Sequence, residues 1–293
     1  MPKLLILLLS LLLTACASAP VVSVQSSTLP PASMLPVTEE AGDGLRYTME
    51  LETWEQSSQT EDGTPLVSCV YNLPAMHVVR ADGSEVSEAE TEQETRALEV
   101  AEAFNQEFTA WTGETDFEEL TQEARADLEW RQTEQVEWTT GYVLELDCTV
   151  YQTEKLISVT GIHYNHLDGA AHPNMWYISW NYDLEAGEFF TPDFLGEDTE
   201  LHTAVTEEIV RQANAPAKDG TIPAENYWED YAEIAANWNT TAVAFDGEDM
   251  VVTFSPYELA AFGFGPQAFR ISYGYLEPYL SDHGRELLGL SEG

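Results

Sequence analysis

The most constraining feature of the sequence is an alternation of large apolar residues from Trp176 to Leu184. Apolar side chains occupy every second position of this stretch, and Ser179, Asn181 and Asp183 lie between them. Successive side chains of a strand point to opposite faces, so this pattern predicts a strand with one apolar and one polar face. The chain therefore has to build at least one half-buried sheet.

Other segments predict further strands. They are RYTMELETW, PLVSCVYNL, YVLELDCTVY, KLISVTGIHY, the two segments that flank the turn at Asp246-Gly247, and AFRISYGY, after which LEPYL forms a closing turn.

Helices are predicted between these strands. Inside residues 81–140, a helical stripe of apolar residues runs from Leu98 to Trp111, and Thr115 with Glu118 forms a capping box for a second helix. Thr191-Pro192 marks another helix start, and further helices are expected around residues 201–209, within ENYWEDYAEIAANW, and from Ser255 to Gly263 or Gly265. The predicted fold is α+β, with mainly antiparallel sheet packed against several amphipathic helices.

The N-terminus, MPKLLILLLSLLLTACASAP, has the order of a bacterial export signal. Lys3 is followed by an apolar run that is short for a membrane span, and Leu13-Thr14-Ala15-Cys16 resembles the lipobox of lipoproteins. We predict that Cys16 is lipidated and that the protein is extracytoplasmic, anchored to the bacterial cell membrane through this lipid only. The alternative is an ordinary cleaved signal with an unrelated cysteine.

Composition divides the rest of the chain. The segment after Cys16 is rich in Ala, Ser, Pro, Thr and Val, which is typical of a flexible tether. The predicted organisation is a signal peptide (1–15), a tether (16–43), an N-terminal α+β module (44–154), a C-terminal α+β module packed against it (155–282) and a tail (283–293).

The charge balance restricts the partners. The chain has 11 Lys and Arg against 52 Asp and Glu, a formal net charge of −41 at pH 7. Such a surface repels nucleic acid and favours encounters with cationic proteins. The simpler interpretation is that the charge mainly confers solubility.

Two cysteines remain once Cys16 is assigned to the lipid. Cys69 and Cys148 each lie on the apolar side of a predicted strand. In an exported chain such a pair predicts a disulfide, which would close a loop of about 80 residues and stabilise the fold by roughly 4 kcal/mol. Two buried thiols are the alternative.

Two separated segments resemble a known domain. GAAHPNMWYISWNYDLEAGEFFTPDFL and, far downstream, VVTFSPYELAAFGFGPQAFRISYGYLEPYL are similar to the C-terminal part of the RsiV-type anti-sigma-V ectodomain, a domain of unknown function that also precedes the catalytic domain of PdaC-type peptidoglycan deacetylases. The resemblance covers about residues 155–280 and carries the motif at Gly169 to Pro173. Ala170 replaces the second glycine of that motif.

The resemblance implies an envelope-facing binding or sensing module, and RsiV itself is a receptor for lysozyme. Neither a sigma-binding region nor a deacetylase domain is expected in this chain, so a noncatalytic role is predicted. The expected partner is a basic protein such as lysozyme. The alternative is a cell-wall glycan, bound by an enzyme-accessory module or a hydrolase.

Three histidines are candidates for metal binding or acid–base catalysis. His163, His166 and His172 are candidate metal ligands, but His163 and His166 point to opposite faces of a strand, and CxxC and HExxH patterns are lacking. Asp168 with His172 is a candidate acid–base pair, although a carboxylate close to a histidine is expected by chance in so acidic a chain. We predict no catalytic residue, no metal and no cofactor.

The loop around His172 has a structural explanation of its own. Gly169 permits backbone angles closed to other residues, and Pro173-Asn174 is a good turn centre. We therefore predict that His172 shapes a hairpin by hydrogen bonding, and that Asp168, Gly169, His172, Pro173 and Asn174 form a partner-binding loop.

Overall fold

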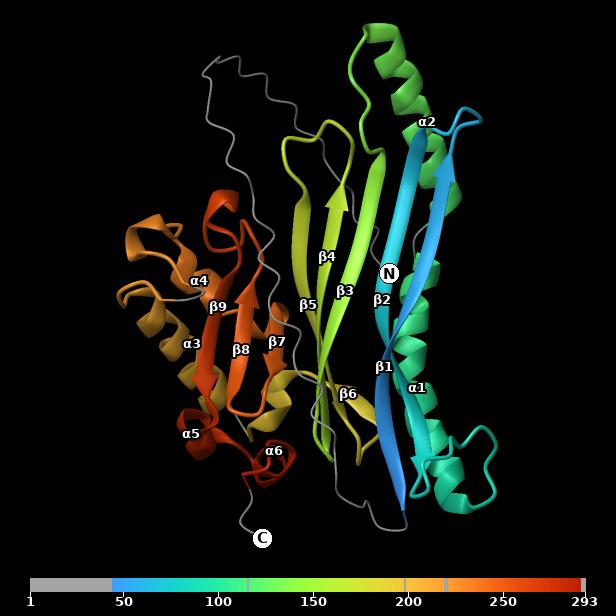
Figure 1. The fold of residues 1–293 in the computed structure, drawn as a ribbon. Coiled ribbons are helices and arrows are strands. Elements are labelled where there is room, and N and C mark those ends of the chain that lie inside the picture. The colour runs from blue at the N-terminus through green and yellow to red at the C-terminus, as the bar shows by residue number, and fades with distance from the viewer. Residues whose placement is uncertain (1–43, 115, 198, 219–220, 291–293) are drawn as a thin grey trace. The chain divides into compact units, whose positions relative to one another are not determined.

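A six-stranded sheet runs from residue 45 to residue 190. The computed structural model describes residues 44–114, 116–197, 199–218 and 221–290. The strands lie in chain order across the sheet (Figure 1), and every neighbouring pair is antiparallel except β2 and β3. They are β1 (Leu45–Gln59), β2 (Pro65–Arg80), β3 (Tyr142–Gln152), β4 (Leu156–His166), β5 (Asn174–Asp183) and β6 (Glu188–Phe190).

The module boundary predicted at residue 154 is wrong. Strands β3 and β4 form a hairpin across it, in which the Thr153 N–H donates to the Leu156 carbonyl at 2.8 Å. The hairpin spans the start of the segment that resembles the known domain, so one sheet contains strands from both predicted modules.

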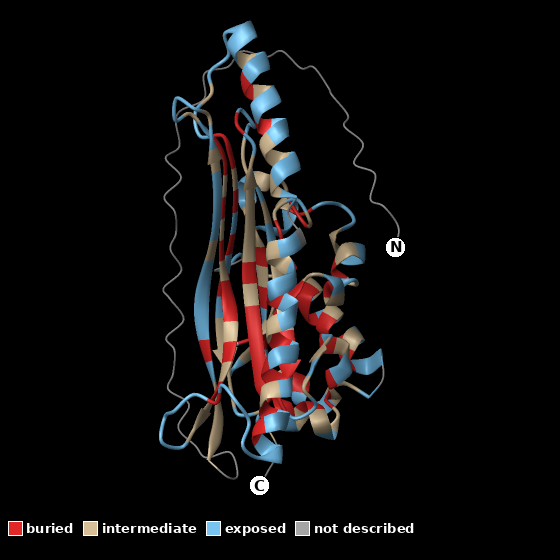
Figure 2. Ribbon diagram, turned by 90° about the vertical axis from the view of Figure 1, so that its right-hand side faces the viewer, coloured by how far each residue is buried: buried red, intermediate tan, exposed pale blue. Residues whose placement is uncertain are grey.

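Helices α1 (Glu92–Glu114) and α2 (Phe117–Glu134) connect the parallel strands β2 and β3. Both carry exposed residues on their outer side (Figure 2). The predicted capping box is one residue out of place, because Asp116 caps α2 by accepting from the Glu119 N–H at 3.0 Å; Thr115 lies outside the described residues.

The apolar face of β5 packs against α1, as its period of two predicts. The Trp180 ring lies 5.0 Å from the Phe108 ring, measured between centroids. Tyr182 is fully buried and donates its hydroxyl hydrogen to the Val100 carbonyl at 2.9 Å. This aromatic layer forms much of the first hydrophobic core.

A second, three-stranded antiparallel sheet consists of β7 (Ala242–Phe245), β8 (Asp249–Phe254) and β9 (Gln267–Ser272) in this order, with the predicted turn at Asp246-Gly247 between β7 and β8. It encloses the second hydrophobic core together with the later helices. These helices are α3 (Thr199–Ala213), α4 (Tyr231–Ala235), α5 (Tyr273–Leu276) and α6 (Asp282–Leu287), with short 3-10 helices at Pro192–Leu195, Ala224–Asn226, Trp238–Thr240, Phe262–Phe264 and Glu277–Tyr279.

The predicted tail from residue 283 is folded as far as residue 290. Ser281 caps α6 by accepting from the Gly284 N–H at 2.9 Å, and Leu287 is buried. His283 Nε2 lies 2.7 Å from a carboxylate oxygen of the buried Asp183. The sequence did not predict this folded end because the contact joins residues 100 positions apart, which no local pattern indicates.

Strand β7 contacts the polar face of β4 and β5 through hydrogen bonds. The Val243 N–H donates to Ser179 Oγ at 2.7 Å, and the Phe245 N–H donates to Ser158 Oγ at 2.9 Å. The Asn181 amide donates to the Val243 carbonyl at 2.8 Å. We call these contacts the inter-sheet joint; they satisfy backbone groups of β7 that no neighbouring strand takes.

The predicted disulfide is wrong. Cys69 and Cys148 are both buried and free. Cys69 lies opposite Leu144 in the β2–β3 pair, and Cys148 is four residues further along β3. At about 3.3 Å per residue this places the two Cα atoms roughly 13 Å apart, whereas a disulfide needs less than about 7 Å.

The predictions about the N-terminus fall outside the described residues. These are the signal peptide, the tether and lipidation of Cys16. Within the described ranges, no helix combines the length and the apolar character needed to cross a bilayer.

Candidate functional site

The loop between β4 and β5 is anchored by Asp168. This side chain is 4% exposed. Its Oδ2 accepts the N–H groups of Thr139, Thr140 and Gly141 at 2.7, 2.8 and 3.1 Å, and the Thr139 hydroxyl at 3.0 Å. Asp168 thus holds the segment that enters β3, and it has no surface to offer to a partner. This corrects its assignment to the partner-binding loop.

Arg131 completes this anchor from the last turn of α2. Its Nη1 lies 3.4 Å from Asp168 Oδ1, and its Nη2 donates to the Asp168 carbonyl. Burial alone acts to raise the pKa of Asp168, but the hydrogen bonds from the backbone around Thr139 outweigh it and hold the pKa below its usual range. Asp168 is therefore a structural carboxylate and not a general acid.

Gly169 follows in the left-handed region, with φ of +76°. A Cβ atom placed there would lie 2.4 Å from Arg131 Nη2. The backbone angle requires glycine here, as the sequence predicts, and a larger residue would also displace the guanidinium group of Arg131.

His172 joins this loop to the second sheet. Its Nδ1 lies 2.9 Å from the Pro173 carbonyl oxygen, which can only accept, so Nδ1 carries the proton in the neutral ring. Nε2 then accepts the hydroxyl hydrogen of Tyr257 at 3.0 Å. The imidazole also stacks on Phe262, with ring centroids 4.0 Å apart. The Nδ1 bond orients the ring within its own loop, and the Nε2 bond and the stacking on Phe262 join this loop to the segment after β8.

Tyr257 has an unusual backbone conformation. Its φ is +76°, a region that tyrosine enters rarely and at a cost of about 1–2 kcal/mol. The predicted helix from Ser255 is therefore a turn. Ser255 Oγ accepts the N–H of Tyr177 in β5 at 3.0 Å, so it does not cap a helix.

Tyr257 belongs to an exposed aromatic cluster, which we call the His172 patch. It comprises His172, Trp228, Tyr257 and Phe262, with Phe264 two residues further along the chain. The Trp228 indole N–H donates to the Tyr257 carbonyl at 3.1 Å, and Trp228, Tyr257 and Phe264 are 39%, 54% and 44% exposed. Large aromatic side chains at such exposure are typical of interaction surfaces.

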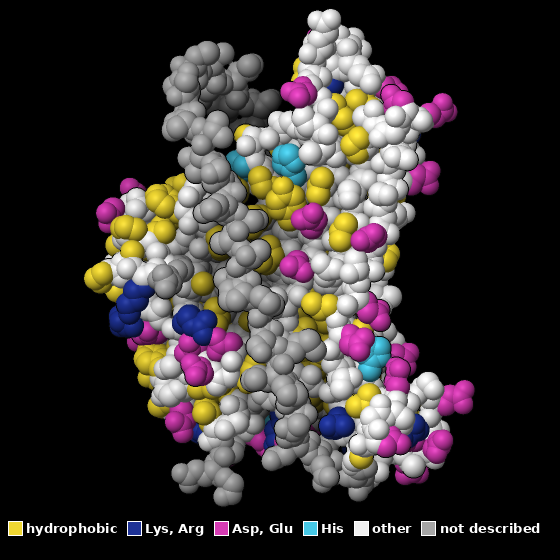
Figure 3. All heavy atoms as spheres, viewed as in Figure 1, with side chains coloured by type: hydrophobic (Ala, Val, Ile, Leu, Met, Phe, Trp, Pro, Cys, Tyr) yellow, Lys and Arg dark blue, Asp and Glu magenta, His cyan; other side chains and the backbone are white. Residues whose placement is uncertain are grey.

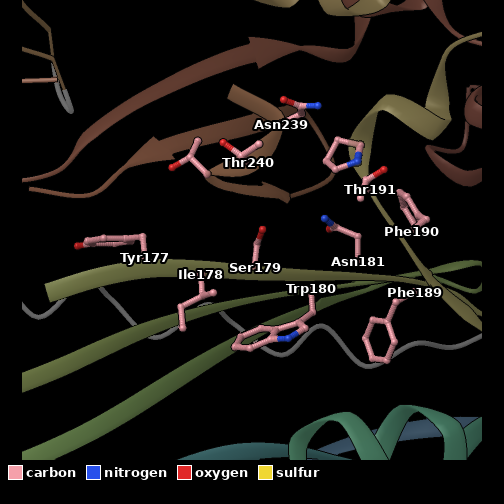
Figure 4. A pocket seen from close by; sticks show the side chains of 12 residues that line it. Tyr177, Ile178, Ser179, Trp180, Asn181, Phe189, Phe190, Thr191, Asn239 and Thr240 are labelled. Atoms are coloured by element: carbon pink, nitrogen blue, oxygen red, sulfur yellow. The ribbon is translucent and has the colours of Figure 1, made fainter. Parts of the chain in front are cut away.

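A separate cleft of about 370 Å³ lies where β5, β6 and the Trp238–Thr240 turn meet. Figure 4 shows Ser179, Asn181, Thr191 and Thr240 around its space, whereas Trp180 points away toward α1. Its described lining contains no carboxylate, imidazole, thiol or amine. This composition fits hydroxyl-rich ligands and supplies no acid–base pair.

The other two histidines are not near His172. His163 stacks on Trp176 at 5.4 Å and contacts Trp111 at 5.9 Å on the α1 side of the sheet, where burial lowers its pKa. His166 contacts Tyr164 on the opposite face, as the strand period predicts. Within the described part of the chain, no cluster of three His, Cys, Asp or Glu residues is placed to hold a metal.

Sequence reasoning missed most of the His172 patch. It predicted the loop from Asp168 to Asn174, whereas Trp228, Tyr257 and Phe262 come from segments read as helices. A left-handed tyrosine has no sequence signal, because glycine and asparagine are the residues expected there. For the segment that contains Tyr257, the sequence predicted only a helix from Ser255 to Gly263 or Gly265.

Solved structures resemble this fold, although no family profile and no curated protein matches the sequence. A member of the DUF3298 family from Bacteroides fragilis is 11% identical, covers 84% of this chain and 97% of its own length, and has a TM-score of 0.59. A DUF3298 family protein from Pseudomonas aeruginosa is 15% identical, with shares of 82% and 96% and a TM-score of 0.47. The chain therefore has an α+β fold similar to that of a DUF3298 protein.

Proposed function

We propose that this chain is a noncatalytic, lipid-tethered module of the bacterial envelope that binds a basic protein through the His172 patch. The observation that carries the proposal is the strained backbone of Tyr257, held in place by His172 and Trp228. Strain of this kind persists only where the surrounding structure holds it, and it concentrates at binding sites.

Charge supports a basic partner. Acidic side chains extend over both sheets on the face shown in Figure 3, and Lys and Arg occur at only a few places. The field of such a surface speeds encounters with cationic proteins. The resemblance to the RsiV ectodomain makes lysozyme the first protein to try.

Binding to hen lysozyme tests the proposal. We expect the purified full chain to bind lysozyme at physiological salt, and Tyr257→Ala and Trp228→Ala each to weaken binding about tenfold or more, because exposed aromatic anchors dominate such interfaces. Trp130→Ala is the matched control, since Trp130 is 56% exposed on α2, outside the patch.

Cytochrome c, a basic protein unrelated to lysozyme, supplies the second control. If it binds as tightly as lysozyme, and if both lose binding as salt rises, the attraction is electrostatic only and the proposal fails. Equal losses in Trp130→Ala and Tyr257→Ala would also contradict it.

A second candidate ligand is a cell-wall glycan, and the cleft beside Asn181 favours it. The Asn239 amide and the Thr240 hydroxyl line that cleft together with the Tyr177 ring, whereas the Asn181 amide is taken up by the inter-sheet joint. Calorimetry with a chitin tetrasaccharide tests this candidate. Binding that Asn239→Ala abolishes and Tyr257→Ala leaves unchanged would support the glycan over the protein partner.

A further inference from the structure

Strand β2 pairs with β3 only as far as Asn72. Beyond that residue, the edge of β2 that faces away from β1 is closed in three separate ways. Pro74 has no N–H to offer. The Asn105 side chain accepts the Met76 N–H at 2.7 Å and donates to the Met76 carbonyl at 2.9 Å. The Val86 N–H donates to the Val78 carbonyl at 2.8 Å. An open edge recruits other strands, and this one is blocked along its length.

Strand β1, the partner of β2 in the same hairpin, receives no such protection from the residues that the structure describes. It lies at the end of the six-stranded sheet (Figure 1). Between Glu50 and Ser57 no described residue outside β2 hydrogen-bonds to its backbone, and every residue of this stretch except Trp54 is exposed. Within the described parts of the chain, its outer N–H and C=O groups have no partner and can pair with another strand.

A groove of about 790 Å³ adjoins this stretch of β1. Glu52, Thr53 and Trp54 line it from β1, and residues of β2 and of one flank of α1 complete it. Its apolar lining includes Leu73 and Leu98. An edge strand beside a helix-flanked groove is the arrangement by which several domains take an extended peptide as an added strand.

The groove is acidic. Glu52, Glu85 and Glu102 line it, His77 lies 3.0 Å from Glu85, and no Lys or Arg occurs among its described lining residues. On β1, Glu50, Glu52 and Glu55 form no ion pair with any residue that the structure describes. A basic side chain placed here would gain these carboxylates as partners, while an acidic one would be repelled.

We propose that β1 takes an extended basic segment of a partner protein as an additional strand, with alternate side chains entering the groove beside α1. A second copy of this chain is a poor occupant, because pairing two β1 strands would set like charges opposite each other. This inference goes beyond the proposed function, since it uses a surface separate from the His172 patch.

Peptides test strand addition directly. The probe is a fluorescent nonapeptide of alternating lysine and valine, added to the full chain, with a glutamate–valine peptide as the charge control. Residues that share a face of a strand also share an edge, so N-methylation of either the lysines or the valines blocks one edge only. We expect one methylated peptide to lose binding at least tenfold and the other to keep it, and hydrogen exchange to slow in residues 50–57.

Paired variants locate the site. Glu52→Gln with Glu102→Gln should weaken binding of the lysine–valine peptide about two- to fivefold, the range of exposed ion pairs. Glu123→Gln with Glu129→Gln removes two exposed acids of α2 outside the groove and should change binding less than twofold. Tyr257→Ala should leave peptide binding unchanged.

Several results would overturn the inference. These are equal binding of the two methylated peptides, equal losses in the two glutamate pairs, or a β1-dependent dimer in sedimentation. Loss of peptide binding in Tyr257→Ala alone would move the peptide to the His172 patch and leave the proposed function standing. A wild-type chain that binds the peptide but does not bind lysozyme would instead contradict the proposed function.

Discussion

The two faces of β5 are both covered, but by opposite kinds of contact. On one face, Trp180 and Tyr182 pack against the aromatic residues of α1. On the other, Ser179 and Asn181 hydrogen-bond to the backbone of β7. The apolar face stabilises the fold by removing apolar area from water, and this contribution tolerates small shifts of the side chains. The polar face depends on hydrogen-bond donors and acceptors that meet at fixed distances. A polar strand face is therefore not always a solvent face.

The largest effect is expected on the apolar face. Tyr182→Ala should lower the free energy of unfolding by about 3–5 kcal/mol, as for other buried aromatic truncations, because it empties a fully buried site. Tyr182→Phe keeps the ring and loses only the bond to the Val100 carbonyl, so about 1 kcal/mol is expected. Urea denaturation measures both. Similar losses in the two variants would show that the hydrogen bond, not packing, dominates this face.

The inter-sheet joint should come next. Asn181→Leu leaves the Val243 carbonyl without its donor and the Ser158 hydroxyl without its acceptor, which should cost about 2–3 kcal/mol. Ser179→Ala removes one acceptor of the same joint and should cost about 1 kcal/mol. Hydrogen exchange should rise in β7 before it rises in β5. If Asn181→Leu unfolds with the same free energy as the wild type, the hydrogen bonds of the inter-sheet joint do not contribute to stability.

Asp168 should have a smaller, pH-dependent effect. Asp168→Asn weakens the anchor under the entry to β3 and should cost about 1–3 kcal/mol at pH 7. The folded pKa lies below the unfolded value of about 3.9, so the carboxylate stabilises the wild type above that pH and ceases to do so as pH falls through the folded pKa. The difference between the two proteins should therefore shrink below about pH 4. A constant difference down to pH 2 would contradict this assignment.

The smallest effect on stability is expected for the two buried thiols, Cys69 in β2 and Cys148 in β3. Burial raises the pKa of Cys69 to about 11 and that of Cys148 to about 12. Both should resist a thiol reagent at pH 8 in the folded state and react once urea unfolds the chain. A reducing agent should leave the melting temperature unchanged. A lower melting temperature after reduction would indicate a disulfide, which the β2–β3 register rules out.

The sequence predicted local patterns well and pairings poorly. The period of two in β5, the left-handed Gly169 and the turn at Asp246-Gly247 were each readable, because one side chain or one short period decides them. The disulfide failed because both cysteines are on apolar faces but far apart in register. The module boundary failed because it followed the extent of the resemblance, whereas β3 and β4 pair across it in one sheet.

The candidate site shows the same difference between local patterns and long-range contacts. The loop carrying His172 was found from its own residues, whereas its contacts with Tyr257 and Phe262 join segments about 85 positions apart. By itself the sequence determined the α+β class, the individual strands and the acidic surface, because these follow from local periodicity and composition. Only the tertiary structure decided which polar groups are buried, which edge of the sheet stays open and which aromatic side chains meet. Those features depend on long-range register, which no local pattern encodes.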